Sequence, residues 1–244
     1  MLETDYREEF CLARDFDENF VRSLMEAGFL VMSMELEADI DSTDSADSGD
    51  DEGKADKSGR FFILMPKLHL VRSALFFPDL HIKKSIHPLL SKYELRVDTD
   101  FDLIVDKCLA QHGEDWLTPP LVEIIKSMRR NSVASQNEPQ SAALNIAHNA
   151  GVTRARPFSF GVYRDGELKA GEFGILMGRV YTSYSGYFDE KNAGTVQMIL
   201  MTQWMEKSDF DFLDFGMPLD YKTDLGAQDI QPRRFVELFR KARA

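Results

Sequence analysis

The chain has 244 residues, of which 43% are hydrophobic and 11% aromatic, so it can bury a sizeable core as one large domain or as a small domain followed by a medium one. Its formal net charge of −12 argues against generic nucleic-acid binding. The sequence has no apolar run approaching the roughly 20 residues of a membrane helix, and its acidic N-terminus does not support a secretory signal.

An amphipathic helix followed by a strand is predicted near the N-terminus. Asp17 is a suitable N-cap for a helix over Asp17–Ala27, and Gly28 suits the position just after it. Phe29–Leu36 has the composition of a strand. The next stretch, residues 39–59, is acidic and nearly free of apolar side chains. Such a segment cannot offset its ordering entropy by burial, so we predict an acidic disordered loop.

Strands and helices interleave through the middle of the chain. Strands are predicted over Phe61–Met65, which Pro66 interrupts, over Leu68–Phe77 and over Glu94–Asp100. Helices are predicted over His81–Tyr93, bent or ended near Pro88, over Phe101–Gln111 and over Pro119–Arg130. A second long loop is expected over residues 131–157, with a helical piece at Ala142–Ala147.

The C-terminal half predicts a hairpin, a helix and a strand. The turn Arg164–Gly166 separates two strand-like runs, Phe158–Tyr163 and Gly171–Phe188. Asp-Gly between such runs is a strong hairpin signal, because the turn needs a positive φ. A helix over Asn192–Lys207 and a strand over Phe210–Phe215 follow, and then a glycine-containing loop. The interleaving predicts an α+β or α/β layer, with any chemistry where these strand ends meet.

The sequence carries no general catalytic motif, and its five histidines show no metal-like pairing. Cys11 and Cys108 lack zinc-site spacing and indicate reduced thiols, which favours the cytoplasm. We therefore expect neither a metal nor another cofactor. The C-terminal hairpin, helix and strand resemble the core of acyltransferases of the GNAT type, which hold the acyl donor where two neighbouring strands splay apart. Gly186–Thr195 lacks the glycine-rich phosphate loop that an acetyl-CoA enzyme needs there.

Five segments carry a more specific resemblance. In chain order they are RSALFFPDLHIKKSI (Arg72–Ile86), VDTDFDLIVDKC (Val97–Cys108), WL (Trp116–Leu117), LKAGEFGILMGRVYTSYSGYF (Leu168–Phe188) and LDFGMPLDYKTDLGAQDI (Leu213–Ile230). In this order and spacing the chain resembles the leucyl/phenylalanyl-tRNA–protein transferases, which use aminoacyl-tRNA in place of acyl-CoA. The resemblance implies an α+β fold. A GNAT-like domain over residues 79–244, a mixed sheet flanked by helices, would follow a small N-terminal α/β region over residues 1–78 that contains the acidic loop.

The resemblance implies four catalytic positions, which are Tyr184, Ser185, Asp214 and Gly216. Tyr184 replaces the family's glutamate and Gly216 its glutamine, two groups thought to orient the acceptor amine and handle its proton. We expect Tyr184 to hydrogen-bond the amine or the tRNA ribose, and the alternative is a cross-strand packing residue. An aminoacyl ester is activated, so positioning can supply much of the acceleration.

Two sets of binding residues are also expected. A pocket for an apolar aminoacyl side chain is assigned to Trp116, Phe173, Ile175, Met177, Tyr181 and Leu213, although any core strand would contain such residues. Contacts to the tRNA acceptor stem are assigned to Arg72, His81, Lys83, Lys84, Lys92, Arg233 and Arg234. The basic tail over residues 232–244 either faces a polyanion or solubilises a terminal helix.

The expected function is transfer of leucine or phenylalanine from aminoacyl-tRNA to the N-terminus of an acceptor protein, as the first step of degradation by the N-end rule. The expected enzyme is a cytoplasmic monomer with no membrane partner. Two alternatives stay open. One is an acyl- or peptidyltransferase with another donor or acceptor, which the missing glutamate and glutamine favour. The other is a non-catalytic relative that binds tRNA or a peptide.

Overall fold

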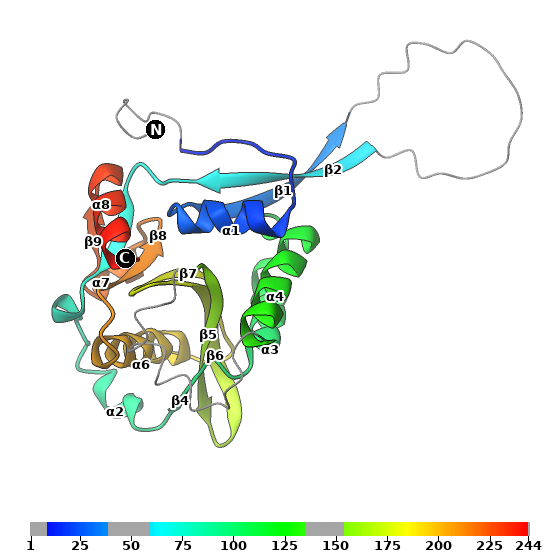
Figure 1. Ribbon diagram of the computed structural model, residues 1–244. Coiled ribbons are helices and arrows are strands. Elements are labelled where there is room, and N and C mark those ends of the chain that lie inside the picture. The colour runs from blue at the N-terminus through cyan, green and yellow to red at the C-terminus, as the bar shows by residue number, and fades with distance from the viewer. Residues whose placement is uncertain (1–8, 39–58, 135–153, 244) are drawn as a thin grey trace, which may run out of the picture.

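The computed structural model describes residues 9–38, 59–134 and 154–243. The predicted acidic loop, apart from Gly59, and the predicted helical piece at Ala142–Ala147 lie outside these ranges. Within the described residues, a seven-stranded sheet forms the centre of the molecule and a two-stranded ribbon extends from it (Figure 1). None of the helices in these ranges is long and apolar enough to cross a membrane.

The central sheet is mixed, which confirms the predicted fold class. Its strand order is β4-β5-β6-β7-β8-β3-β9, and every neighbouring pair is antiparallel except β7 with β8. The strands are β3 (Arg72–Leu75), β4 (Glu94–Val97), β5 (Arg156–Arg164), β6 (Glu167–Met177), β7 (Val180–Phe188), β8 (Phe212–Gly216) and β9 (Gln228–Ile230).

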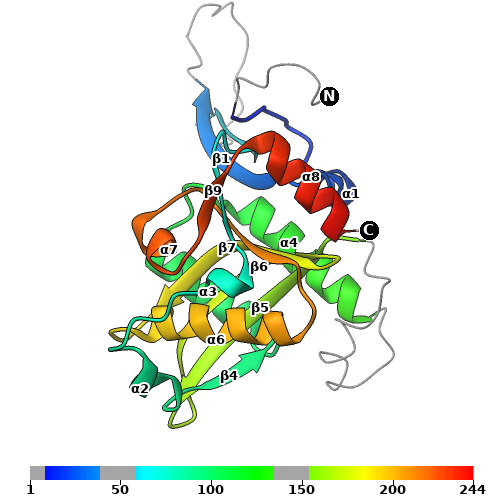
Figure 2. The same cartoon turned by 90° about the vertical axis from the view of Figure 1, so that its left-hand side faces the viewer.

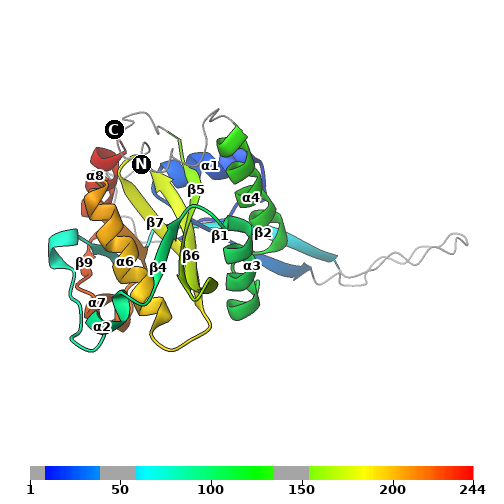
Figure 3. The same cartoon turned by 90° about the horizontal axis from the view of Figure 1, so that it is seen from below.

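Helices cover both faces of the sheet, because apolar side chains leave the strands in both directions. On one face lies α6 (Ala193–Lys207), and on the other lie α3 (Phe101–His112) and α4 (Pro119–Ala134) (Figure 3). The α3–α4 face shares its core with α1 (Glu18–Glu26) and α8 (Pro232–Ala242), which lie side by side (Figure 2). The short elements are η1 (Phe77–Asp79), α2 (His87–Leu90) and α7 (Asp220–Asp224).

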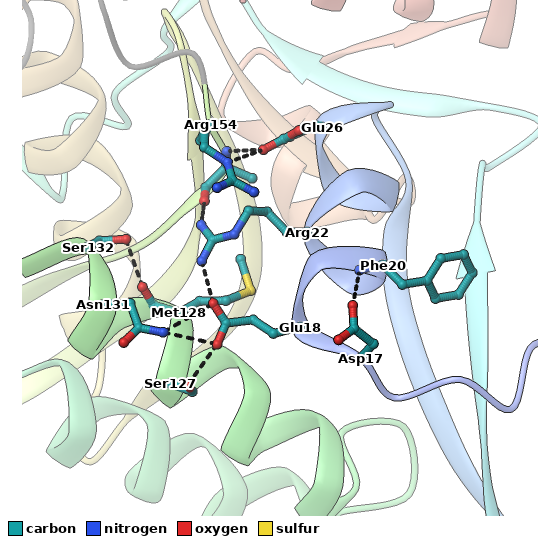
Figure 4. Close-up of polar contacts among 11 residues, drawn as sticks. Asp17, Glu18, Phe20, Arg22, Glu26, Ser127, Met128, Asn131, Ser132 and Arg154 are labelled. Atoms are coloured by element: carbon teal, nitrogen blue, oxygen red, sulfur yellow. Dashed lines mark hydrogen bonds and ion pairs between the residues drawn. The ribbon is translucent and has the colours of Figure 1, made fainter. Parts of the chain in front are cut away.

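The N-terminal helix forms as predicted and is tied to the rest of the fold. Asp17 caps α1 by accepting a hydrogen bond of 3.0 Å from the Phe20 amide. Glu18 accepts from Ser127 of α4 at 2.7 Å and pairs with Arg22 at 2.7 Å, and Arg22 also donates to the Ala155 carbonyl next to β5 (Figure 4). These contacts hold α1 against both α4 and the central sheet.

The ribbon pairs β1 (Leu30–Ala38) with β2 (Gly59–Lys67) antiparallel over their full length. The prediction that Pro66 interrupts the second strand is wrong. The Pro66 carbonyl accepts from Cys11, and Leu64 bonds Ala13 in both directions. The main-chain groups of these two β2 residues therefore point away from β1, so the missing N–H of Pro66 costs the ribbon no ladder bond.

Other predicted bounds also change. The strand predicted over Leu68–Phe77 shortens to β3, and the helix predicted over His81–Tyr93 shortens to α2. Pro88 lies at the start of α2, where proline is favoured, and so does not end a longer helix there. The run Gly171–Phe188 divides into β6 and β7 at Gly178, whose φ is 56°.

Two further predictions concern turns and boundaries. The turn at Asp165 and Gly166, with φ of 54° and 81°, is confirmed. Residues 131–134 extend α4 and are not part of a loop. The expected division at residue 78 stays a prediction. β3 lies on the N-terminal side of that division, yet it hydrogen-bonds into the central sheet between β8 and β9.

Candidate functional site

A cavity opens where two parallel strands separate. β7 and β8 pair at only three positions, the last of which is Thr182 with Asp214. A cavity of about 700 Å³ lies beyond this point, lined by Ser183–Phe188 on β7 and by Phe215, Gly216 and Met217 at the end of β8. This is the kind of strand separation that the GNAT resemblance leads us to expect, at the strand ends expected to carry the chemistry.

The remaining wall of the cavity comes from both sides of the sheet. On the side of α3 and α4 the wall is formed by the following residues: Leu30 and Met32 of β1, Lys67, His69, Gln111 and His112 at the end of α3, and Trp116. On the side of α6 it is formed by residues at the start of that helix, by Glu172 of β6 and by Lys222 of α7. The first side thus combines the apolar side chains of Leu30, Met32 and Trp116 with polar ones, and the α6 side carries the buried charges of Glu172 and Lys222.

Tyr184 is the extra residue of a β-bulge. Phe173 and Gly174 are consecutive on β6, yet they pair with Ser185 and Ser183, which skips Tyr184. The Tyr184 ring packs on Phe173 at 6.3 Å between centroids, and its hydroxyl accepts a hydrogen bond of 2.9 Å from the Val31 amide. Burial raises the pKa of Tyr184 above its ordinary value. The side chain therefore packs across strands while it also lines the cavity, as Ser185 does.

Asp214 is buried beside the cavity and is held by four hydrogen bonds. Arg72 donates two, at 2.8 and 2.6 Å, and the Thr182 hydroxyl and the Gly216 amide donate the others at 2.9 and 3.0 Å. The Arg72 guanidinium also lies 4.3 Å from the centre of the Phe235 ring. Arg72 is fully buried, so the prediction that it contacts tRNA is corrected, because its charge is used inside the fold.

Asp214 also departs from its predicted catalytic role, because it does not line the cavity. It acts on the cavity wall through Gly216, whose amide it binds. Gly216 has φ of 73°, a conformation that glycine adopts at little cost, and it does line the cavity. The predicted position Gly216 is thus part of the wall, and Asp214 holds that wall in place.

The predicted apolar pocket is largely corrected. Trp116 lines the cavity, but the other five residues do not: Phe173, Ile175, Met177, Tyr181 and Leu213. All five are buried in the two hydrophobic cores that flank the sheet. Alternation along the strands identified them as inward-facing, and on a sheet covered on both faces an inward-facing residue meets a helix.

The remaining predicted tRNA contacts are exposed and lie outside the cavity. The set near the start of the GNAT-like region is His81, Lys83, Lys84 and Lys92. Lys83 pairs with Asp224 of α7 at 2.6 Å, so this segment lies close to one wall of the cavity. Arg233 and Arg234 are exposed at the start of α8, where both approach Glu237. Their role in tRNA binding stays a prediction.

Glu172 is a cavity residue that the sequence analysis missed. Only 3% of it is exposed, and in the described part of the chain its Oε1 has no hydrogen-bond partner. Burial raises the pKa of the carboxyl to about 7, against the opposing effect of nearby Ser183, Gln197, Tyr181 and Lys222. The available signal was an acid inside the apolar run AGEFGILM, where a strand between two cores should carry none.

Lys222 and His69 were missed as well. The Lys222 ammonium donates to the Phe215 and Met217 carbonyls at 2.7 and 2.9 Å, and burial lowers its pKa to about 8. His69 is buried, and burial followed by the charges of Arg72 and Lys67 lowers its pKa to about 4, so the imidazole is neutral near pH 7. Lys222 lies within the segment Leu213–Ile230, but no pattern there marks a buried lysine, and His69 lies outside the five segments, so neither could be identified in advance.

His69 borders a position that distinguishes this chain from the transferases it resembles. A Cβ built on Gly216 would lie 3.8 Å from His69 Nε2, and this nitrogen has no hydrogen-bond partner among the described residues. The imidazole thus lies beside the position at which the resemblance implies the family's glutamine. No three His, Cys, Asp or Glu side chains in the described ranges converge as metal ligands do.

Comparisons with known proteins agree with the resemblance. The family model described as leucyl/phenylalanyl-tRNA protein transferase matches residues 74–240. A leucyl/phenylalanyl-tRNA–protein transferase of Pseudomonas putida (strain W619) is 26% identical over 68% of this chain and 66% of its own length. Those of Maridesulfovibrio salexigens and Campylobacter lari are 23% and 25% identical, over 70% of this chain in each case and 65% and 68% of their own lengths. The chain thus spans just under two-thirds of the first two relatives.

Among solved structures, L-PGS from Bacillus licheniformis aligns with 71% of this chain and 65% of its own, at 12% identity and a TM-score of 0.39. The C-terminal domain of a lysylphosphatidylglycerol synthetase from Agrobacterium fabrum aligns with 70% of this chain and 56% of its own, at 10% identity and a TM-score of 0.37. Similarity at this level does not establish a shared fold.

Proposed function

This chain belongs to the leucyl/phenylalanyl-tRNA–protein transferase family, and from that membership we propose that it moves leucine or phenylalanine from aminoacyl-tRNA to the N-terminal amine of an acceptor protein. The structural observation that supports the proposal is the cavity between the separated ends of β7 and β8. We further propose that it works as a monomer in the cytoplasm, where the transfer would begin degradation by the N-end rule.

The cavity can accommodate the two reacting groups on its two walls. In this proposal the aminoacyl side chain lies against the apolar side chains of Leu30, Met32 and Trp116. The acceptor amine then approaches from the α6 side of the cavity, which carries Glu172. The ester of aminoacyl-tRNA is already activated, so holding amine and carbonyl carbon in contact can supply much of the rate enhancement.

Tyr184 and Ser185 lie between these walls, on the bulge. The Tyr184 hydroxyl uses an oxygen lone pair to accept from Val31, which leaves its hydrogen free to donate. We propose that it donates to the ribose of the terminal nucleotide. The exposed cations outside the cavity, Lys83, Lys84, Lys92, His81, Arg233 and Arg234, would contact acceptor-stem phosphates, which predicts binding that weakens steeply with salt.

A transfer assay tests this function. Radiolabelled Leu-, Phe- and Arg-tRNA are incubated with the protein and a peptide that has a basic N-terminal residue, and the N-acetylated peptide serves as the control. We expect label in the free-amine peptide from Leu- or Phe-tRNA and none in the acetylated one. Binding of tRNA without transfer would point to a non-catalytic relative. Tight acetyl-CoA binding without tRNA affinity would contradict the proposal.

A further inference from the structure

Glu172 is a buried acid in β6, whose other buried positions carry apolar side chains or glycine. Its neighbours across the strands are Phe160 on β5 and Gly186 on β7. A Cβ on Gly186 would lie 3.3 Å from the Cβ of Glu172, so any larger residue there would crowd the carboxylate. The glycine leaves the side chain of Glu172 facing the cavity that it lines.

The carboxylate is only partly satisfied: hydrogen bonding from Ser183, Gln197 and Tyr181 opposes the rise in pKa that burial causes, but one oxygen has no partner among the described residues. In the described part of the chain Oε1 has no hydrogen-bond partner, and Glu172 makes no ion pair. The nearby Lys222 directs its ammonium to two main-chain carbonyls. Leaving a buried charged oxygen unpaired is costly, so the position is suited to a group that arrives with a ligand.

The pKa of Glu172 is suited to proton transfer near neutral pH. The titratable groups that influence it come from three elements: Tyr181 on β7, Cys108 on α3, and Tyr221 and Lys222 on α7. Burial outweighs them and places the carboxyl's pKa at about 7. A general base is most effective when its pKa lies near the working pH.

We propose that the Glu172 carboxylate receives the α-amino group of the acceptor N-terminus and takes the proton that this group must lose. The inference rests on the proposed function. The α-ammonium gives one proton to Glu172, and the neutral amine attacks the ester carbonyl carbon. The C–N bond forms, the ester C–O bond breaks, and the ribose oxygen leaves with the second proton of the attacking nitrogen. Glu172 then releases its proton to water.

This role accounts for a departure of the chain from its family. Tyr184 stands where the family carries glutamate, and the bulge turns Tyr184 toward Phe173, away from the α6 side where Gln197 and Glu172 lie. Glu172 lies on the neighbouring strand β6 and supplies a carboxylate to the cavity in place of that glutamate. Both substrates carry a primary α-ammonium group, so an experiment must distinguish the acceptor amine from the donor's own.

The first arm measures transfer as a function of pH for the wild type, for Glu172→Gln and for Glu167→Gln. Glu167 lies on the same strand, exposed and paired with Lys169, and so controls for loss of an acid. We expect Glu172→Gln to lower kcat/KM about a hundredfold at pH 7 and to remove the rise in kcat/KM through about pH 7. Glu167→Gln should match the wild type. A Glu172→Gln enzyme within about threefold of the wild type, with the same rise, would overturn the proposal and leave the transferase function intact.

The second arm measures binding and needs no turnover. Calorimetry compares a free-amine peptide with its N-acetylated form, and Phe-tRNA with N-acetyl-Phe-tRNA. We expect the wild type to favour the free-amine peptide about tenfold or more, and Glu172→Gln to lose this preference. Loss of discrimination between the two donors instead would assign Glu172 to the donor and overturn the proposal.

The two arms separate the possible failures. A wild type that transfers nothing but shows a Glu172-dependent preference for the free amine would contradict the proposed function and retain the amine site. Absence of both transfer and preference would overturn both. The carboxamide has the shape of the carboxylate and removes a buried charge, so Glu172→Gln should fold, and its thermal melt checks this point.

Discussion

The two ends of the β7–β8 junction each hold a buried carboxylate, and the two carboxylates differ in their hydrogen-bond partners. At the closed end, Asp214 receives four hydrogen bonds, two of them from Arg72. At the open end, Glu172 is as well buried but keeps an oxygen without a partner in the described residues. Buried polar groups are nearly always hydrogen-bonded in folded proteins, so we assign Asp214 a structural role and propose that a ligand group binds the unpaired oxygen of Glu172.

Removal of the buried ion pair between Arg72 and Asp214, at the closed end of the junction, should have the largest effect on stability. Arg72→Met leaves the Asp214 carboxylate buried without its cation, which we expect to cost about 3–5 kcal/mol of unfolding free energy. Urea denaturation measures the loss. Arg179→Met, which breaks an exposed ion pair with Asp211, is the control and should cost at most about 1 kcal/mol. Equal costs for the two variants would show that the junction does not depend on the buried pair.

At the open end we expect that removing the acid, by Glu172→Gln, stabilises the protein near neutral pH. The pKa of Glu172 is raised in the folded protein from 4.5 to about 7. Between these pH values the carboxyl ionises in the unfolded chain but stays protonated in the folded one, so the native state loses stability as the pH rises. The wild type should match Glu172→Gln in stability below about pH 4.5 and fall behind it as pH rises to about 7, by about 3 kcal/mol. Denaturation of both proteins from pH 4 to pH 8 measures the gap. A constant gap across this range would contradict the raised pKa.

Tyr184→Phe should destabilise the bulge in β7. Loss of the hydroxyl leaves the Val31 amide without its partner, which should cost about 1–2 kcal/mol. Tyr187→Phe is the matched control. Its hydroxyl is buried and has no partner among the described residues, so its removal should cost under about 0.5 kcal/mol. Thermal melts compare the two.

The same Tyr184→Phe variant tests the proposed contact to the tRNA ribose. Charge-neutral hydrogen bonds of this kind are worth about 1 kcal/mol, so we expect kcat/KM for transfer to fall about fivefold. Unchanged transfer would remove Tyr184 from the site and leave it as a packing residue.

The smallest effect is expected at Gly216. An alanine there must adopt φ of 73°, which costs about 1 kcal/mol, and its nearest neighbour, His69 Nε2, is 3.8 Å away, so no clash adds to this cost. Gly166→Ala is the control, with φ of 81° and no neighbouring atom within 4 Å. The two variants should lose similar stability in urea. A much larger loss at Gly216 would indicate that Asp214 constrains this turn more tightly than its single bond implies.

Much of the fold was predictable because it depends on local signals. The cap at Asp17, the Asp165–Gly166 turn and the long helix α6 each follow from short patterns, and all three form. The predicted ends of a strand and a helix were wrong where a proline was taken as a break without knowledge of which main-chain groups pair in the fold. Pro66 sits on the side of β2 that does not need its N–H, and Pro88 starts a helix instead of ending one.

The site was harder to predict because it depends on long-range pairing. Family motifs directed attention to Tyr184, Ser185 and Gly216, which do line the cavity. They gave Arg72 and Asp214 separate roles, whereas the two residues neutralise each other 142 positions apart in sequence. The sequence shows Glu172 as a charged residue in an otherwise apolar strand. That it faces a cavity becomes clear only from the structure, in which it pairs with Gly186.

The role of the cavity in transfer is tested most directly by blocking the cavity and measuring transfer. Thr195→Trp places an indole in the cavity from the first turn of α6, and Gln203→Trp places the same group on the same helix away from it. We expect the wild type and Gln203→Trp to transfer leucine or phenylalanine to the peptide, and Thr195→Trp to do so at least tenfold more slowly with an unchanged thermal melt. Undiminished transfer by Thr195→Trp, or none by the wild type, would contradict the proposed role of the cavity.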